Sequence, residues 1–173
     1  MPQLGVYDIV FRLSNLTLIG LLSLNAIAEP KFSEIFAGGD RERLKKTVRR
    51  TTFTGIWLSI PVILLLALFP RFILDLFDTD GAFLTGSTTL YILLGGHLIS
   101  VLCGAVLIVL NMTGNQRSVQ MILITTTLLN ILLNAILIPV AGIEGAAWAT
   151  AFSTLVWNIW GWRMVRKKLG FSM

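Results

Sequence analysis

The sequence predicts an all-α polytopic membrane helix bundle with about five transmembrane helices. Hydrophobic residues make up 55% of the 173 residues and charged residues only 13%, so the chain is more apolar than a typical soluble domain. The apolar residues form long runs, such as 60–69 and 131–138, with short polar segments between them. A membrane β-barrel would instead show segments of about ten residues with alternating polarity. Helical spans of about 20 residues therefore fit the pattern better.

Five spans are expected within a single transmembrane domain that covers residues 1–173. Their expected bounds are 4–28, 51–69, 89–110, 120–140 and 145–164. Pro30 is expected to end the first helix, and two glycines followed by Asp40 indicate a turn. The segment 29–50 is therefore predicted to be a basic loop at the cytoplasmic surface.

Basic residues are distributed unequally between the two sides of these spans. Seven of the fourteen lie in 29–50, one is Arg117 and four lie in 163–168, so twelve fall on one side. The opposite side holds only Arg71, and Arg12 lies within the first span. Cytoplasmic segments carry an excess of Lys and Arg, so we expect the N-terminus outside and the C-terminus in the cytoplasm. The orientation of the chain in the membrane thus explains the net charge of +5, and nucleic acid is not expected as a partner.

Tryptophans gather in the last expected span. Trp148, Trp157, Trp160 and Trp162 lie there, and the last two adjoin the basic tail. Amphipathic rings favour the headgroup region, so these side chains are expected to anchor the helix at the membrane interface. Small residues recur every four positions between 142 and 153 and would let another helix approach closely.

Polar residues of the first span share one face. Asp8, Arg12, Asn15 and Ser23 fall within an arc of about 80° on a helical wheel. Charges inside a span are costly and usually face a bundle interior or a water-filled cavity, which makes Arg12 the leading functional candidate. An i,i+4 ion pair between Arg12 and Asp8 near the membrane edge explains the same charges equally well.

The third and fourth expected spans also carry polar faces. An imidazole such as that of His97 can relay protons near neutral pH, although a lone histidine more often only hydrogen-bonds. Asn130 and Asn134 lie one turn apart on a face shared with Thr126 and Thr127, where they can hydrogen-bond to neighbouring helices. Such amides also join helices in proteins that transport nothing. The sequence leaves both interpretations open.

Signs of catalysis or metal binding are weak. Asp75, Asp78 and Asp80 lie together in an expected loop and could hold a divalent cation. Their spacing, with Thr79 after the second aspartate, does not match the aspartate motif of membrane-embedded phosphotransferases. A catalytic triad, a phosphate-binding loop and a zinc motif are also missing from the sequence, and Cys103 has no partner. We therefore expect no enzyme, no cofactor and no metal site.

Seven short motifs follow one another along nearly the whole chain. They are Gly-Val-Tyr at 5–7, Arg-Leu at 12–13, Gly-Asp-Arg-Glu at 39–42, Pro-Arg-Phe-Ile-Leu-Asp-Leu-Phe at 70–77, Asn-Met-Thr-Gly-Asn-Gln-Arg at 111–117, Leu-Leu-Asn-Ile-Leu-Leu-Asn at 128–134 and Gly-Ile-Glu-Gly-Ala-Ala-Trp-Ala-Thr at 142–150. In this order and spacing the chain resembles the C-terminal half of polysaccharide exporters, of O-antigen or teichoic-acid type, in the multidrug/oligosaccharidyl-lipid/polysaccharide flippase superfamily.

This resemblance implies a partial lobe of a two-lobed transporter that moves undecaprenyl-linked oligosaccharides across a bacterial inner membrane by alternating access. The five expected spans resemble spans eight to twelve, so the first lobe and the opening helix of the second are missing. A missing N-terminal lobe or another half-transporter is therefore an expected partner, besides the lipid bilayer. Repeat-built transporters place their sites at the interface between repeats, so transport by this chain alone is not expected.

The resemblance also implies a role for the polar residues. Arg12 matches a recurrent arginine of a cationic cavity that receives a pyrophosphate or an acidic sugar. The expected substrate pathway comprises Arg12, Asp8, Asn15, His97, Asn130 and Asn134. The main rival is a multidrug/cation antiporter of the same superfamily, which would need an intramembrane carboxylate, and Asp8 is the only candidate. A membrane scaffold without transport would need no aligned polar faces.

Overall fold

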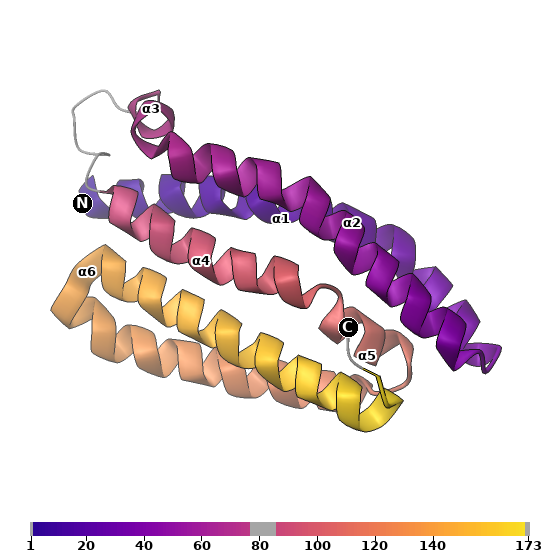
Figure 1. Cartoon of the computed structure of the whole chain (residues 1–173). Coiled ribbons are helices and arrows are strands. Elements are labelled where there is room, and N and C mark those ends of the chain that lie inside the picture. Colours follow the sequence, from indigo (N-terminus) through magenta and orange to yellow (C-terminus); the bar gives the residue numbers. More distant parts are fainter. Residues whose placement is uncertain (1, 77–85, 172–173) are drawn as a thin grey trace.

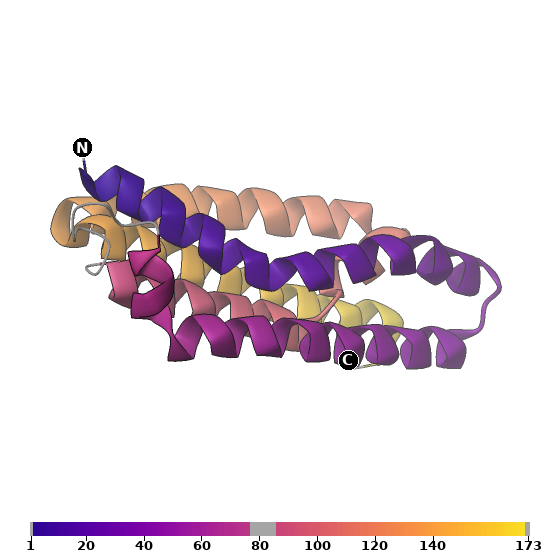
Figure 2. The same cartoon turned by 90° about the horizontal axis from the view of Figure 1, so that it is seen from above.

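The computed structural model describes residues 2–76 and 86–171, and within them the chain is helical with no strand (Figure 1). The helices are α1 (Pro2–Ala37), α2 (Arg41–Leu68), α3 (Pro70–Asp75), α4 (Ser87–Cys103), α5 (Val106–Met112) and α6 (Gln116–Leu169). The long helices run side by side along one bundle axis (Figures 1 and 2). The prediction of an all-α membrane helix bundle is confirmed.

The expected loop at 29–50 is wrong, because α1 continues through Pro30 to Ala37 and α2 begins at Arg41. Only a short turn joins the two helices, and Gly39 supplies its left-handed φ of 74°. Asp40 caps α2, since its Oδ1 accepts a hydrogen bond of 2.9 Å from the backbone N–H of Arg43. The basic segment is therefore a helical hairpin, which extends past the other helices (Figure 2).

Side-chain packing explains why Pro30 does not end α1. A proline inside a helix removes one backbone hydrogen bond and clashes with the preceding turn, so the helix must be held from outside. Phe32 and Ile35, just after the proline, are buried in one cluster with Leu44 and Val48 of α2. Burial of several large apolar side chains is worth more than the lost bond, and the helix persists.

Helix α6 reverses direction at Gly142, whose φ of 56° and ψ of −130° are not helical. We call residues 116–141 the N limb and residues 143–169 the C limb, and Figure 1 shows them running antiparallel. The reversal is tight, because a Cβ on Gly145 would overlap the backbone carbonyl oxygen of Leu137. Glycine at both positions therefore permits the turn.

A second glycine breaks the expected span 89–110. Gly104, with a φ of 67°, separates α4 from α5, and the two helices meet at a bend of 43°. A Cβ at Gly104 would overlap the side chain of Thr52 on α2, so the break is where α2 approaches closely. What the sequence predicts as one straight span is thus a bent pair.

By length and composition, α1, α2 and α6 can each cross a membrane, and the bent α4 and α5 together can form one further span. Each limb of α6 exceeds the roughly 20 residues that one crossing needs. The two limbs coincide with the expected spans at 120–140 and 145–164.

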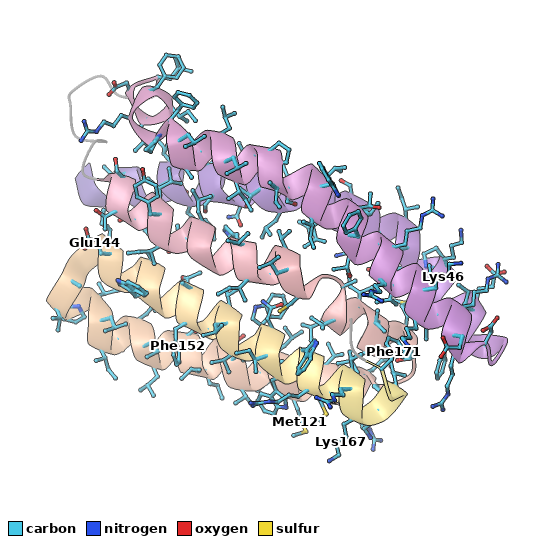
Figure 3. The ribbon with its side chains drawn as sticks, in the orientation of Figure 1. Lys46, Met121, Glu144, Phe152, Lys167 and Phe171 are labelled. Atoms are coloured by element: carbon cyan, nitrogen blue, oxygen red, sulfur yellow. The ribbon has the colours of Figure 1, made fainter. Side chains whose placement is uncertain are left out.

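The two ends of the bundle differ in charge. The start of α2 and both ends of α6 lie toward the same end of the bundle, which therefore holds the basic segments 41–50 and 163–168 with Arg117 (Figure 1). Figure 3 places Lys46 and Lys167 at this end and Glu144 at the other. We call it the basic end.

We expect Gly145→Ala to lower the free energy of unfolding by about 2 kcal/mol or more, because the new Cβ must displace backbone at Leu137. The matched control is Gly95→Ala in α4, where no atom lies within 4 Å of the added Cβ. That change should be neutral or stabilise by up to about 1 kcal/mol. Thermal or denaturant unfolding of the purified chain in detergent measures both. Equal stability of the two variants would contradict the tight reversal.

Candidate functional site

A cleft of about 740 Å³ lies between α1 and the two limbs of α6. From α1 and the N limb it is lined by Tyr7, Phe11, Leu123, Thr126, Thr127, Asn130, Asn134 and Ile138. From the reversal and the C limb it is lined by Gly142, Ile143, Ala146, Thr150, Ser153, Thr154 and Trp157. None of these lining residues carries a charge at neutral pH, so the cleft is polar but uncharged.

Two asparagines provide the polar wall of the N limb. The Nδ2 group of Asn134 donates to the backbone oxygen of Asn130 at 2.9 Å and to its Oδ1 at 3.0 Å. The pair thus hydrogen-bonds within its own helix, and among the described residues it makes no hydrogen bond to a neighbouring helix. Asn130 Nδ2 and Asn134 Oδ1 keep unused hydrogen-bonding capacity toward a ligand.

The C limb adds a polar group without a partner. The hydroxyl of Ser153 is buried and lacks a hydrogen-bond partner among the described residues, although it belongs to a residue that lines the cleft. A buried polar group that stays unsatisfied costs free energy, and a water molecule or a polar ligand in the cleft would remove that cost.

Aromatic rings form the wall on α1. Tyr7 and Phe11 stack with ring centroids 5.9 Å apart and an interplanar angle of 18°, and Trp157 faces the same cleft from the C limb. Tyr7 and Phe11 are not among the residues predicted from sequence, because the polar faces of a helical wheel leave out aromatic rings. Their i,i+4 spacing, continued by Asn15, was the signal that could have found them.

The predicted polar face of α1 lies beside this wall. Arg12 Nε and Asp8 Oδ2 form an ion pair of 2.9 Å, with the two side chains 77% and 57% exposed. Asn15 is half-buried, and its Nδ2 donates to the backbone oxygen of Phe11 at 2.9 Å. Val6, Val10 and Leu13 cover the buried side of α1, so the polar face points away from the rest of the described chain.

His97 lies apart from the cleft. It is buried in α4, and its Nε2 lies 3.3 Å from the hydroxyl of Ser14 on α1. A similar bond joins α6 to α4, where the Nδ2 of Asn158 donates to the hydroxyl of Ser100 at 3.0 Å. Sequence reasoning singled out His97 and missed Asn158, which is 1% exposed.

Metal ligands are not grouped in the part of the chain that is described, where no three His, Cys, Asp or Glu side chains come together. Asp75 ends α3, whereas Asp78 and Asp80 of the considered acidic loop lie outside the described residues.

Comparison with known protein families identifies the family of this chain. The MatE family model matches residues 2–136, which include α1 to α5 and most of the N limb. The chain belongs to the MatE family. Its members are transporters of the MOP superfamily and not enzymes, and the apolar helices agree with an integral membrane protein. Searches of the curated proteins and of the solved structures found no match.

We expect the bond between Asn158 and Ser100 to contribute about 0.6 kcal/mol and at most about 1.7 kcal/mol to stability. A double-mutant cycle with Asn158→Ala and Ser100→Ala, measured by unfolding in detergent, gives this coupling energy. His97→Ala paired with Asn158→Ala serves as the control cycle, because His97 bonds to α1 instead. A coupling energy near zero for the first pair would contradict the bond.

Proposed function

We propose that this MatE-family chain forms part of a transporter lobe that translocates lipid-linked oligosaccharides, with the cleft and the adjoining polar face of α1 as its share of the substrate pathway. The observation that carries the proposal is an uncharged cleft of about 740 Å³, lined by amides, hydroxyls and aromatic rings, beside an accessible arginine. Its volume lies in the range of about 300–1,000 Å³ that is common for small-molecule sites.

The lining groups match the chemistry of a sugar. Sugar hydroxyls both donate and accept hydrogen bonds, as do the side chains of Asn130, Asn134 and Thr127. The stacked rings of Tyr7 and Phe11 provide a flat apolar surface for the C–H face of a sugar ring. Uncharged polar groups hold such a ligand without the tight binding that would slow its release.

Arg12 supplies a positive charge near this wall that could meet a phosphate. It follows Phe11 directly on α1, so its guanidinium lies on the flank of the cleft, where Asp8 neutralises it. A guanidinium can donate two parallel hydrogen bonds to a phosphate group. A pyrophosphate linkage would therefore replace Asp8 as the partner of Arg12 while the sugar occupies the cleft.

A second lobe completes the pathway in this proposal. The cleft is open to the outside, and the Asp8 and Arg12 pair is exposed on α1, a helix long and apolar enough to cross a membrane. Charges facing hydrocarbon are costly, so a protein surface or a water-filled cavity must cover this pair. An N-terminal lobe or another half-transporter is the partner that fits, and the polyprenyl chain would extend into the bilayer.

A multidrug/cation antiporter is the second candidate. The rings of Tyr7, Phe11 and Trp157 could hold an aromatic cation in the same cleft. Against it, the residues lining the cleft include no carboxylate for ion coupling, and Asp8 is already paired with Arg12.

We expect Arg12→Ala, placed in the complete transporter, to lower polymer export by about tenfold or more, because a charge-assisted contact with phosphate is lost. Export is measured as surface polymer on cells whose membranes contain equal amounts of each variant. Arg71→Ala on the exposed face of α3 is the matched control and should export normally.

A second variant, Asn134→Leu, separates the two candidates. Under the proposal it lowers oligosaccharide export but leaves efflux of a cationic dye unchanged, while Asn111→Leu outside the cleft lowers neither. Normal export by both Arg12→Ala and Asn134→Leu would refute the proposed pathway. Loss of dye efflux alone would favour the antiporter.

We also propose that the basic end faces the cytoplasm of a bacterial inner membrane, because basic segments are retained on that side. In a Cys103→Ser background, Ser33→Cys in the hairpin should react with a membrane-impermeant maleimide only after the cells are permeabilised. Leu76→Cys, next to α3, should react in intact cells. Both positions are exposed, so access to the reagent depends on the side of the membrane. The reverse labelling pattern would invert the topology.

A further inference from the structure

Another hollow lies on the C limb of α6, beyond residue 136, where the match to the family model ends. It measures about 590 Å³ and is lined by Leu155, Val156, Ile159, Trp160, Arg163, Met164 and Lys167. All of these residues belong to the C limb, and none of them lines the transport cleft. We call this hollow the C-limb groove.

The groove has two cations at one end. Arg163 and Lys167 are both exposed and lie one turn apart, so they share one face of the helix. The part of the chain that is described offers neither of them an ion pair or a hydrogen bond. The sequence contains no Asp or Glu after Glu144, so acidic neighbours along this helix are missing as well. Two adjacent positive charges are thus left for an anion from outside the chain.

The remainder of the groove is apolar and leads away from the basic end. Ile159 lies one turn from Arg163, and Val156 and Leu155 lie on the next turn, about 12 Å from the cation along the axis. The side chains of Phe152 and Trp148 are 49% and 57% exposed. They continue the exposed side of the helix toward the reversal. An apolar track of this length matches the upper part of an acyl chain.

Trp160 marks the level at which the headgroup would lie. Its ring is half-buried and lines the groove between the apolar track and the cations. Indole rings prefer the boundary between headgroups and hydrocarbon. Arg166 is engaged elsewhere, since its guanidinium lies over the ring of Trp162 at 5.9 Å from the centroid. The cations of this helix end therefore have different tasks.

We propose that the C-limb groove binds one anionic phospholipid, with Arg163 and Lys167 at the phosphate and the acyl chain along Ile159 and Val156. Charge complementarity selects this occupant, because the groove joins two unpaired cations to an apolar track that continues into the membrane. Basic pockets on the cytoplasmic side of membrane helices have the same combination of features. The inference requires only a membrane location and does not depend on the transported substrate.

The test uses the full chain purified in detergent and titrated with phosphatidylglycerol, with phosphatidylcholine as the uncharged comparison. Binding is measured as retained lipid by native mass spectrometry and as the rise in melting temperature. Arg163→Gln with Lys167→Gln should lower the apparent affinity for phosphatidylglycerol by about tenfold or more. The matched control, Lys46→Gln with Lys168→Gln, removes the same charge from exposed positions outside the groove and should bind normally.

Two further arms distinguish a lipid from a free anion. Val156→Trp fills the apolar track but keeps both cations, so it should also weaken phosphatidylglycerol binding. Glycerol 3-phosphate, which has no acyl chain, should neither bind nor raise the melting temperature. Equal loss in the control pair would reduce the effect to general surface charge and overturn the site. Unchanged binding by Val156→Trp, or equal binding of phosphatidylcholine, would overturn it as well.

Discussion

Backbone hydrogen bonding in a medium without water constrains every segment of this chain. In hydrocarbon an unpaired N–H or C=O costs several kcal/mol, so spans stay helical wherever lipid surrounds them. Glycines interrupt the apolar helices at points where another part of the chain lies close. Gly104 breaks the α4 and α5 pair against Thr52, and Gly142 reverses α6 where Gly145 meets the backbone of Leu137. Both breaks are possible because the residue is glycine.

The reversal at Gly142 creates the candidate site. It brings the N limb and the C limb together, so that Asn130 and Asn134 face Ser153 and Trp157 across one cleft with Tyr7 and Phe11 of α1. Residues more than a hundred positions apart in sequence thereby line the same cleft. Polar groups within the cleft satisfy each other only in part, as the buried hydroxyl of Ser153 shows. A polar occupant would complete them.

Two kinds of polar residue serve different purposes in this bundle. His97 with Ser14, and Asn158 with Ser100, join helices through buried hydrogen bonds and leave little capacity for anything else. Asp8 and Arg12 are instead paired at an exposed surface, where a partner of opposite charge could replace either of them. Burial thus separates packing residues from candidate contact residues, and helical-wheel position alone does not, because both kinds lie on polar faces.

Cations at the basic end also differ in their surroundings. Asp40 caps the start of α2 within the charged hairpin, and Arg166 lies over Trp162, whereas Arg163 and Lys167 adjoin an apolar track. The cations at this end therefore have three kinds of surroundings: the charged hairpin, an indole ring and an apolar track. The position of each cation on its helix, and not the number of cations, determines these surroundings.

Composition and apolar run length determined the fold class, and the positions of the basic residues indicated that positive charge gathers at one end, because both follow from transfer of side chains into hydrocarbon. They could not determine that α1 passes through Pro30, since this depends on burial of Phe32 and Ile35 against α2. The polar faces of the predicted helices indicated Asn130 and Asn134 as candidate site residues but not Tyr7 and Phe11. The stacked rings of Tyr7 and Phe11 become one wall of the cleft only when α6 folds back. Tertiary structure alone decided which polar residues meet, because a helix brings together residues three or four apart, whereas a cleft is built by segments distant in sequence.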